Sequence, residues 1–212
     1  MIPIDTVLWL RGTRAGLGPL RVDLVESYWR WENDPQVRLG YGQQSPQSLE
    51  ERRERLLRQL GSWRDEARFT IYDVSGDRPI PIGTTALVVD HPRRTAEFFI
   101  LIGDAARRSR GVGTEATRLT LDYGFHITSL RCIHLRVLAP NTPAIRAYEK
   151  AGFQVIGTRR GSGYWLGAPT DEVLMDAVPE EFCGPSAVRD IVAEQRTSIW
   201  PGQDRPESPA GR

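Results

Sequence analysis

Lysine, cysteine and histidine are scarce in this sequence of 212 residues. Lys150 is the only lysine, so arginine supplies almost all of the 28 basic residues, and 27 acidic residues oppose them. The formal net charge of +1 gives no overall attraction to nucleic acid or to an anionic membrane surface. We therefore expect neither as a partner.

The two cysteines, Cys132 and Cys183, lie far apart without CxxC spacing, which argues against a disulfide framework or a thiolate metal site. The histidines at positions 91, 126 and 134 lack the HExxH arrangement. No run approaches the roughly 20 apolar residues that span a bilayer, and residues 1–10 lack the pattern of a signal peptide. These absences predict a cytoplasmic protein without a metal ion.

Length and composition favour one main domain, because 40% of the residues are hydrophobic and can form a single core. We predict this domain over residues 1–180 and a carboxy-terminal extension over residues 181–212. Pro185, Pro201, Pro206 and Pro209 interrupt the extension, and its last dozen residues are mostly polar, Gly or Pro. We expect the end of the extension to be disordered.

The hydrophobic pattern predicts an α/β (α+β) fold with a mixed, largely antiparallel sheet of six to seven strands flanked by helices. The predicted strands cover residues 7–10, 68–74, 80–89, 95–102, 132–138, 153–158 and part of 172–178. The predicted helices cover residues 24–31, 49–60, 113–127 and 143–150. Asp23 and Glu26 have the spacing of a capping box for the first helix. Asn33-Asp34-Pro35 is expected to end that helix.

A glycine-containing segment between a predicted strand and a predicted helix has the features of a phosphate-binding loop. It reads Arg108-Ser109-Arg110-Gly111-Val112-Gly113-Thr114. The glycines let the backbone approach a ligand, and the amides at the start of the helix point toward it. Arg108 and Arg110 could add charge-assisted hydrogen bonds to phosphate.

Two other phosphate-binding patterns do not fit this segment. A dinucleotide fingerprint would need a tight turn after the strand and an acidic residue about 20 positions later, and neither is present. A P-loop would need Gly-Lys followed by Ser or Thr, which is also missing.

The chain resembles the GNAT acetyltransferases over roughly residues 5–180. Arg108, Gly111 and Gly113 match the family signature Arg/Gln-x-x-Gly-x-Gly/Ala, and residues 141–153 match its second signature. Residues 31–37, 96–103 and 171–175 resemble the RimJ/RimL-like branch. The resemblance implies acetyl-CoA as cosubstrate, bound in a cleft between the fourth and fifth predicted strands.

The resemblance also implies roles for individual residues in cofactor binding. The backbone of the loop would hold the pyrophosphate, the backbone of the preceding strand would pair with the pantetheine arm, and the asparagine of the second signature would contribute. These residues are Arg108, Ser109, Arg110, Gly111, Val112, Gly113 and Thr114 in the loop, Ile100, Leu101 and Ile102 in the strand, and Asn141.

The family pattern suggests two catalytic residues. Glu97 is the candidate base, directly or through water, because relatives commonly carry a glutamate at this strand start; a solvated surface glutamate is the alternative. Some relatives place a base at the position of Arg136, and this departure leaves the base open. Tyr148, seven positions after Asn141, is the candidate general acid for the departing thiolate, and simple packing is the alternative.

The acceptor is expected to be a primary amine, either a protein N-terminal α-amine or a small amine such as a polyamine or an aminoglycoside. Trp29, Trp31 and Tyr41 belong to the segment that covers the acceptor pocket in this family, although core packing is the favoured alternative for the helical tryptophans. Transfer would be direct, because Cys132 has no adjacent histidine. The rival function is a non-catalytic acyl-CoA-binding sensor or partner subunit. Dimers are common in similar enzymes, so a homodimer is also an expectation.

Overall fold

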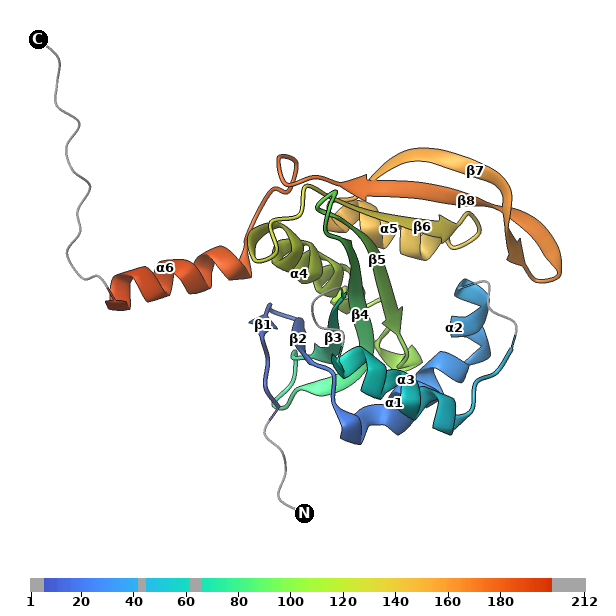
Figure 1. Ribbon diagram of the computed structural model, residues 1–212, viewed down its shortest axis with the longest axis horizontal. Helices are drawn as coiled ribbons and strands as arrows, with labels where there is room; N and C mark the ends of the chain where they lie inside the picture. The colour runs from blue at the N-terminus through green and yellow to red at the C-terminus, as the bar shows by residue number, and fades with distance from the viewer. Residues whose placement is uncertain (1–5, 42–44, 62–65, 200–212) are drawn as a thin grey trace, which may run out of the picture.

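The computed structural model describes residues 6–41, 45–61 and 66–199 (Figure 1). Within these residues one sheet of eight strands has the order β1-β2-β3-β4-β5-β6-β8-β7. The strands are β1 (Leu10–Arg11), β2 (Ala15–Pro19), β3 (Glu66–Asp73), β4 (Ile80–Asp90), β5 (Thr95–Ile102), β6 (Cys132–Leu138), β7 (Gln154–Trp165) and β8 (Ala168–Ala177). The helices are α1 (Val25–Asn33), α2 (Pro35–Gly40), α3 (Leu49–Gly61), α4 (Val112–His126), α5 (Thr142–Ala151) and α6 (Ala187–Ile199).

The predicted mixed and largely antiparallel sheet is confirmed, because β5 and β6 are parallel and the other described neighbours are antiparallel. The bounds of β5 and β6 are the predicted ones. The predicted strand count was too low. The hairpin of β1 and β2 replaces the strand expected at residues 7–10, because the Gly- and Pro-containing β2 forms a strand only by pairing with β3.

One of the two predictions about the ends of the first helix was wrong. Asp23 does not cap α1, because its carboxylate pairs with Arg21 at 2.6 Å and the helix begins at Val25. Ser48 and Glu51 instead form a reciprocal capping box at the start of α3, with hydrogen bonds of 3.0 and 3.1 Å. Asp34 does end α1, but it also caps the unpredicted α2 by accepting a hydrogen bond from the Gln36 N–H.

Helices cover both faces of the sheet. Phe69 and Ile71 of β3 belong to a core cluster that contains Val112, Ala116 and Leu119 of α4. Thr70 lies between them in the strand, and its hydroxyl contacts the Tyr28 hydroxyl of α1 at 2.6 Å. Because successive side chains of a strand point to opposite faces, α4 and α1 lie on opposite sides of the sheet (Figure 1).

The carboxy-terminal extension starts with an ordered segment that packs on α4. Asp122 of α4 is buried, and its carboxylate accepts hydrogen bonds from the Ser186 hydroxyl at 2.6 Å and the Val188 N–H at 3.1 Å. Arg118 of α4 donates to the Cys183 carbonyl and lies over the Phe182 ring. From this anchor α6 projects away from the body (Figure 1). The disorder predicted for the end of the extension concerns residues 200–212, which lie outside the described residues.

In the described part of the chain, no helix is both long and apolar enough to cross a membrane.

Candidate active site

A cleft opens where β5 and β6 separate. The two strands pair only at Thr95 with Cys132, Ala96 with Ile133 and Glu97 with His134. Beyond these positions β6 continues to pair with β8 as far as Leu138, whereas no described strand pairs with the rest of β5 on this side. The backbone of residues 98–102 can therefore pair with an extended ligand along this edge. Ile100, Leu101 and Ile102 lie in this stretch, as the cofactor prediction requires.

The predicted phosphate-binding loop follows β5 after residues 103–107, and two arginines hold it in place. The Arg107 guanidinium donates to the buried Asp73 carboxylate at 2.5 Å. Arg108 donates through Nε to the Ile102 carbonyl at 3.0 Å and through Nη1 to the Gln36 side chain at 3.0 Å. Its Nη2 also lies 3.3 Å from the Asp34 carboxylate. These contacts join the loop to β3, β5 and α2.

The start of α4 has the backbone geometry that the glycine pattern predicts. Gly111 is the residue before the helix, and its φ of +81° lies in the region that favours glycine. Ser109 also has a positive φ, +60°. Val112 is buried in the core, so only its backbone can contribute to ligand binding. Gly113 lies in the first turn, where an added Cβ would make ordinary contact with Ile102 at 3.5 Å.

A groove of about 900 Å³ separates the starts of α4 and α5. Its walls come from the β1–β2 turn, the loop with α4, and α5. The lining residues are Thr13, Arg14, Ser109, Gly111, Thr114, Glu115, Arg118, Thr142, Pro143, Arg146, Ala147 and Lys150. The groove is rich in basic residues, but neither Arg108 nor Arg110 lines it. Arg108 is engaged with protein groups and positions the loop, and contact of the Arg108 and Arg110 side chains with phosphate stays a prediction.

Asn141 and Tyr148 lie at the two ends of α5. Asn141 caps the helix by accepting a hydrogen bond from the Ala144 N–H at 3.4 Å, and Gly40 of α2 lies beside it. The Tyr148 ring packs on Phe98 of β5 and on Phe153, with ring centroids 6.1 and 6.0 Å away. Within the described residues its hydroxyl makes no hydrogen bond. Burial raises the pKa of Tyr148 to about 12, so the phenol stays protonated at neutral pH.

Glu97 lies at the last paired position of β5. Its carboxylate accepts a hydrogen bond from Arg136 Nε of β6 at 3.0 Å. Ala96 and Phe98, its neighbours in the strand, point into the core beneath α4 and α5, so Glu97 points to the opposite face. Arg136, which stands at the alternative position for a base, thus contacts Glu97, the candidate base.

The three aromatic residues predicted for the acceptor pocket differ in their surroundings. Trp29 donates to the Gln47 carbonyl at 2.7 Å and fixes the segment before α3. Trp31 packs directly over Gly103, immediately after β5. Tyr41 is 41% exposed, but its hydroxyl donates to the Ile100 carbonyl within the cleft. Burial of that hydroxyl and the nearby Tyr148 raise the pKa of Tyr41.

Other chemistry receives little support from the described residues. No group of three or more His, Cys, Asp or Glu side chains there could hold a metal ion. Burial, together with Asp176, raises the pKa of the Cys132 thiol, which disfavours the nucleophilic thiolate.

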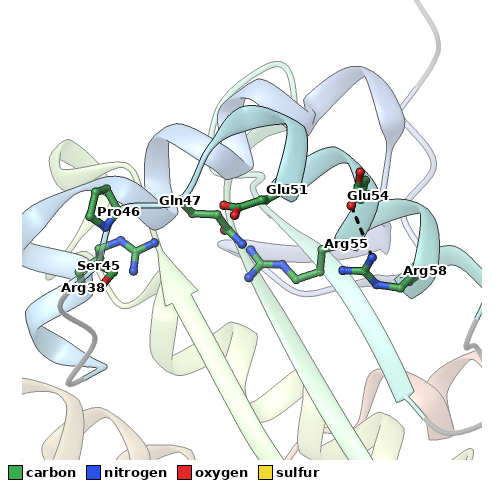
Figure 2. A pocket seen from close by; sticks show the side chains of 8 residues that line it. All are labelled: Arg38, Ser45, Pro46, Gln47, Glu51, Glu54, Arg55 and Arg58. Atoms are coloured by element: carbon green, nitrogen blue, oxygen red, sulfur yellow. Dashed lines mark ion pairs between the residues drawn. The ribbon is translucent and has the colours of Figure 1, made fainter.

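A second hollow, of about 370 Å³, lies between α2 and α3 (Figure 2). Charged side chains dominate its lining, and Arg58 pairs there with Glu54 at 3.9 Å. It shares no lining residue with the groove and contains no residue of β5, α4 or α5. Nothing connects it with the predicted chemistry.

Thr13, Arg14 and Glu115 line the groove but were not predicted as site residues. Glu115 follows the loop immediately, and Gly12-Thr13-Arg14 has the composition of a turn. No sequence pattern indicates that this turn and Glu115, about a hundred residues apart in the chain, lie together in the structure.

Comparison with known proteins supports the resemblance to the GNAT acetyltransferases. The sequence model of a family described as "Acetyltransferase (GNAT) domain" matches residues 14–154. The chain is 38% identical over 98 residues to a probable N-acetyltransferase, YjcK, of Bacillus subtilis, covering 45% of this chain and 52% of that protein. It is 37% identical over 93 residues to the spermidine N(1)-acetyltransferase of Escherichia coli K12, covering 43% and 47%. The chain spans about half the length of the curated relatives it matches.

Solved structures share the fold. A spermidine N-acetyltransferase from Vibrio cholerae in complex with CoA and spermine has a TM-score of 0.72 at 23% identity, covering 81% of this chain and 99% of that chain. A GNAT-family acetyltransferase from Bacillus anthracis has a TM-score of 0.70 at 20% identity, covering 81% of this chain and 99% of that chain. The predicted fold is thereby confirmed.

Proposed function

The chain belongs to the GNAT acetyltransferase family, and from that premise we propose that it transfers an acetyl group from acetyl-CoA directly to a primary amine. One observation carries the proposal: β5 leaves its parallel partner after Glu97, and the opened edge runs from Tyr148 toward the loop. Acetyl-CoA would supply the activated acetyl group there. The β5 edge beyond Glu97, which no described strand covers, fits its extended arm once the Tyr41 hydroxyl releases the Ile100 carbonyl, and the basic groove fits its phosphates.

In this proposal two side chains at the cleft transfer protons, one as the donor and the other as the acceptor. Tyr148 donates a proton to the leaving sulfur; its raised pKa, about 12, makes it a weak acid, so transfer depends on the negative charge that develops on sulfur as the C–S bond breaks. Glu97 accepts the proton of the attacking amine, directly or through water. An alkylamine with a pKa near 10.4 needs such help, because its deprotonation at pH 7 costs about 4–5 kcal/mol.

The acidic side chains near the cleft affect which kind of acceptor amine the protein can bind. Glu97 pairs with Arg136, and Asp34 pairs with Arg108. Glu32 of α1 pairs with both Arg52 and Arg55. Glu97 is the base proposed above, and Asp34 and Glu32 are engaged rather than available to a second ammonium group. We propose an acceptor that presents one amine, such as a protein N-terminal α-amine or a small monoamine, ahead of the polyamines named for the relatives.

Three finer assignments belong to the same proposal: the RimJ/RimL-like branch, a cytoplasmic location and a homodimer. The branch assignment is supported by the sequence stretches around Trp31, Ala96 and Asp171.

The proposal is tested by measuring thiol release from acetyl-CoA with the purified protein and a panel of amines. The panel contains spermidine, an aminoglycoside, a monoamine and peptides with free N-termini. Acceptor-dependent CoA release would support the enzyme. A protein that binds acetyl-CoA with micromolar affinity but releases no thiol with any acceptor would instead support the rival sensor or partner subunit.

A further inference from the structure

The turn between β1 and β2 is bound to the helix that follows the phosphate-binding loop. One carboxylate oxygen of Glu115 accepts hydrogen bonds from the N–H and hydroxyl of Thr13, at 3.1 and 2.9 Å. The other oxygen accepts from the N–H groups of Arg14 and Ala15, both at 2.6 Å. The Arg14 carbonyl in turn accepts from the Val74 N–H at 2.9 Å. The backbone of Arg14 is thus fixed between α4 and the residue that follows β3.

This attachment keeps its strength at neutral pH. Burial alone would raise the pKa of Glu115, but the hydrogen bonds from Ala15, Arg14 and Thr13 outweigh burial and lower it. Because the folded-state pKa is lowered, the stabilisation is fully present above the ordinary value of 4.5 and is lost as the pH falls through the folded-state value. The four hydrogen bonds also reduce the repulsion between this carboxylate and an anion in the groove.

The side chain of Arg14 extends from the fixed turn to the phosphate-binding loop. Its Nη1 donates to the Arg110 carbonyl at 3.4 Å and lies 2.7 Å from the position that a Cβ on Gly111 would take. Arg14 is exposed and lines the groove together with Ser109 and Gly111. Within the described residues, its other guanidinium nitrogens make no hydrogen bond.

We propose that Arg14 is a phosphate-binding residue that contacts the diphosphate of coenzyme A, with Glu115 as the residue that positions it. This inference rests on the proposed function. The diphosphate is the part of the cofactor expected at the backbone amides around Gly111. Arg14 lines the groove, and its guanidinium contacts the carbonyl of the peptide that joins Arg110 to Gly111. Arg14 therefore supplies the charge that the engaged Arg108 does not.

Calorimetry with three ligands tests the assignment: CoA, dephospho-CoA, which lacks the 3′-phosphate, and pantetheine, which has no phosphate. Arg14→Gln should weaken binding of CoA and dephospho-CoA alike, by about tenfold or more, and leave pantetheine unchanged. Unchanged CoA binding would overturn the assignment. So would a loss confined to CoA, which would place Arg14 at the 3′-phosphate, or an equal loss for pantetheine, which would indicate a damaged fold.

Three further variants sharpen the test. Arg11→Gln removes the same charge from the same hairpin outside the groove and should change none of the three affinities. Arg14→Lys should retain part of the affinity, because it keeps the charge but not the planar group. Glu115→Gln should reduce the affinities for CoA and dephospho-CoA without affecting pantetheine. A wild-type protein that bound no CoA would overturn the proposed function as well, whereas normal binding by Arg14→Gln would overturn only the role of Arg14.

Discussion

At the scale of single residues, Tyr148 is the side chain whose loss should affect chemistry most. Tyr148→Phe removes the phenolic proton and keeps the ring that packs on Phe98 and Phe153. We expect turnover to fall by roughly 10- to 1000-fold with cofactor affinity little changed, because the hydrogen bond strengthens as negative charge develops on sulfur. Steady-state kinetics and calorimetry measure the two effects.

The pH dependence adds a second check on Tyr148. Since its pKa is about 12, deprotonation of this group should cause no decline of wild-type turnover below about pH 10. Tyr164→Phe, which removes a phenol from the exposed strand β7, is the matched control and should behave as wild type. Wild-type turnover by Tyr148→Phe, with chemistry shown to be rate-limiting, would contradict the general-acid role.

Glu97→Gln preserves shape and removes basicity. Turnover should fall most near neutral pH and recover partly as the pH rises, because the free amine then becomes more abundant. Arg136→Gln separates this role from simple ion pairing, since it breaks the same contact and keeps the carboxylate. Identical pH–rate profiles for the two variants would mean that the ion pair matters and the base lies elsewhere.

At the scale of elements, the contact between α4 and α6 depends on the buried carboxylate of Asp122. It accepts hydrogen bonds from the Ser186 hydroxyl and the Val188 N–H and also contacts His126 Nδ1 at 2.7 Å. Asp122→Asn replaces one acceptor oxygen by a donor that faces existing donors. We expect a loss of about 1–3 kcal/mol in the free energy of unfolding, measured by thermal or urea denaturation.

Asp77→Asn, in an exposed turn, is the control for that variant and should leave stability unchanged. An Asp122→Asn protein as stable as wild type would show that apolar packing, rather than the carboxylate, holds the extension on α4.

The elements that sequence reasoning predicted well are those with a local signal. β5 is a mostly apolar run and β6 alternates apolar and polar residues, and α5 begins with the Asn-Thr-Pro sequence that favours a helix start. The missed elements depend on partners distant in sequence. β2 is a strand because β3 pairs with it, and α2, with Pro at its first position, is held over the cleft by Arg108.

The candidate site likewise combines features that have a local sequence signal with features that depend on residues distant in the chain. The loop geometry at Gly111 follows from local backbone chemistry and was predictable. The engagement of Arg108 with Asp34 and Gln36, and of Glu115 with the β1–β2 turn, joins segments that only the fold brings together. A guanidinium near a glycine loop therefore looks like a phosphate ligand in sequence, although its actual partners are protein groups.

At the scale of the whole molecule, two truncations should separate the ordered part of the extension from its end. Deleting residues 203–212 should leave turnover and the melting temperature nearly unchanged, as the polar and Pro-rich sequence predicts. Deleting residues 179–212 removes Phe182, Ser186 and Val188 from their contacts with α4. We expect this second protein to melt at least several degrees lower.

Differential scanning calorimetry of both truncated proteins provides the comparison. A large loss on deleting residues 203–212 would mean that these residues bind the domain or a partner. An unchanged melting temperature without residues 179–212 would mean that the contacts with α4 contribute little to stability.

The strand order also constrains how the protein is made on the ribosome. β8 lies between β6 and β7 in space but follows both in the chain. Until residue 177 has left the exit tunnel, positions 133–138 of β6 lack their antiparallel partner, and β7 lacks the described strand with which it pairs. The nascent chain therefore exposes two unpaired strand edges, which are prone to aggregation, after the phosphate-binding loop has emerged. The wall of the cleft that carries Tyr148 is completed last, so a ribosome-bound chain stalled before β8 should be inactive.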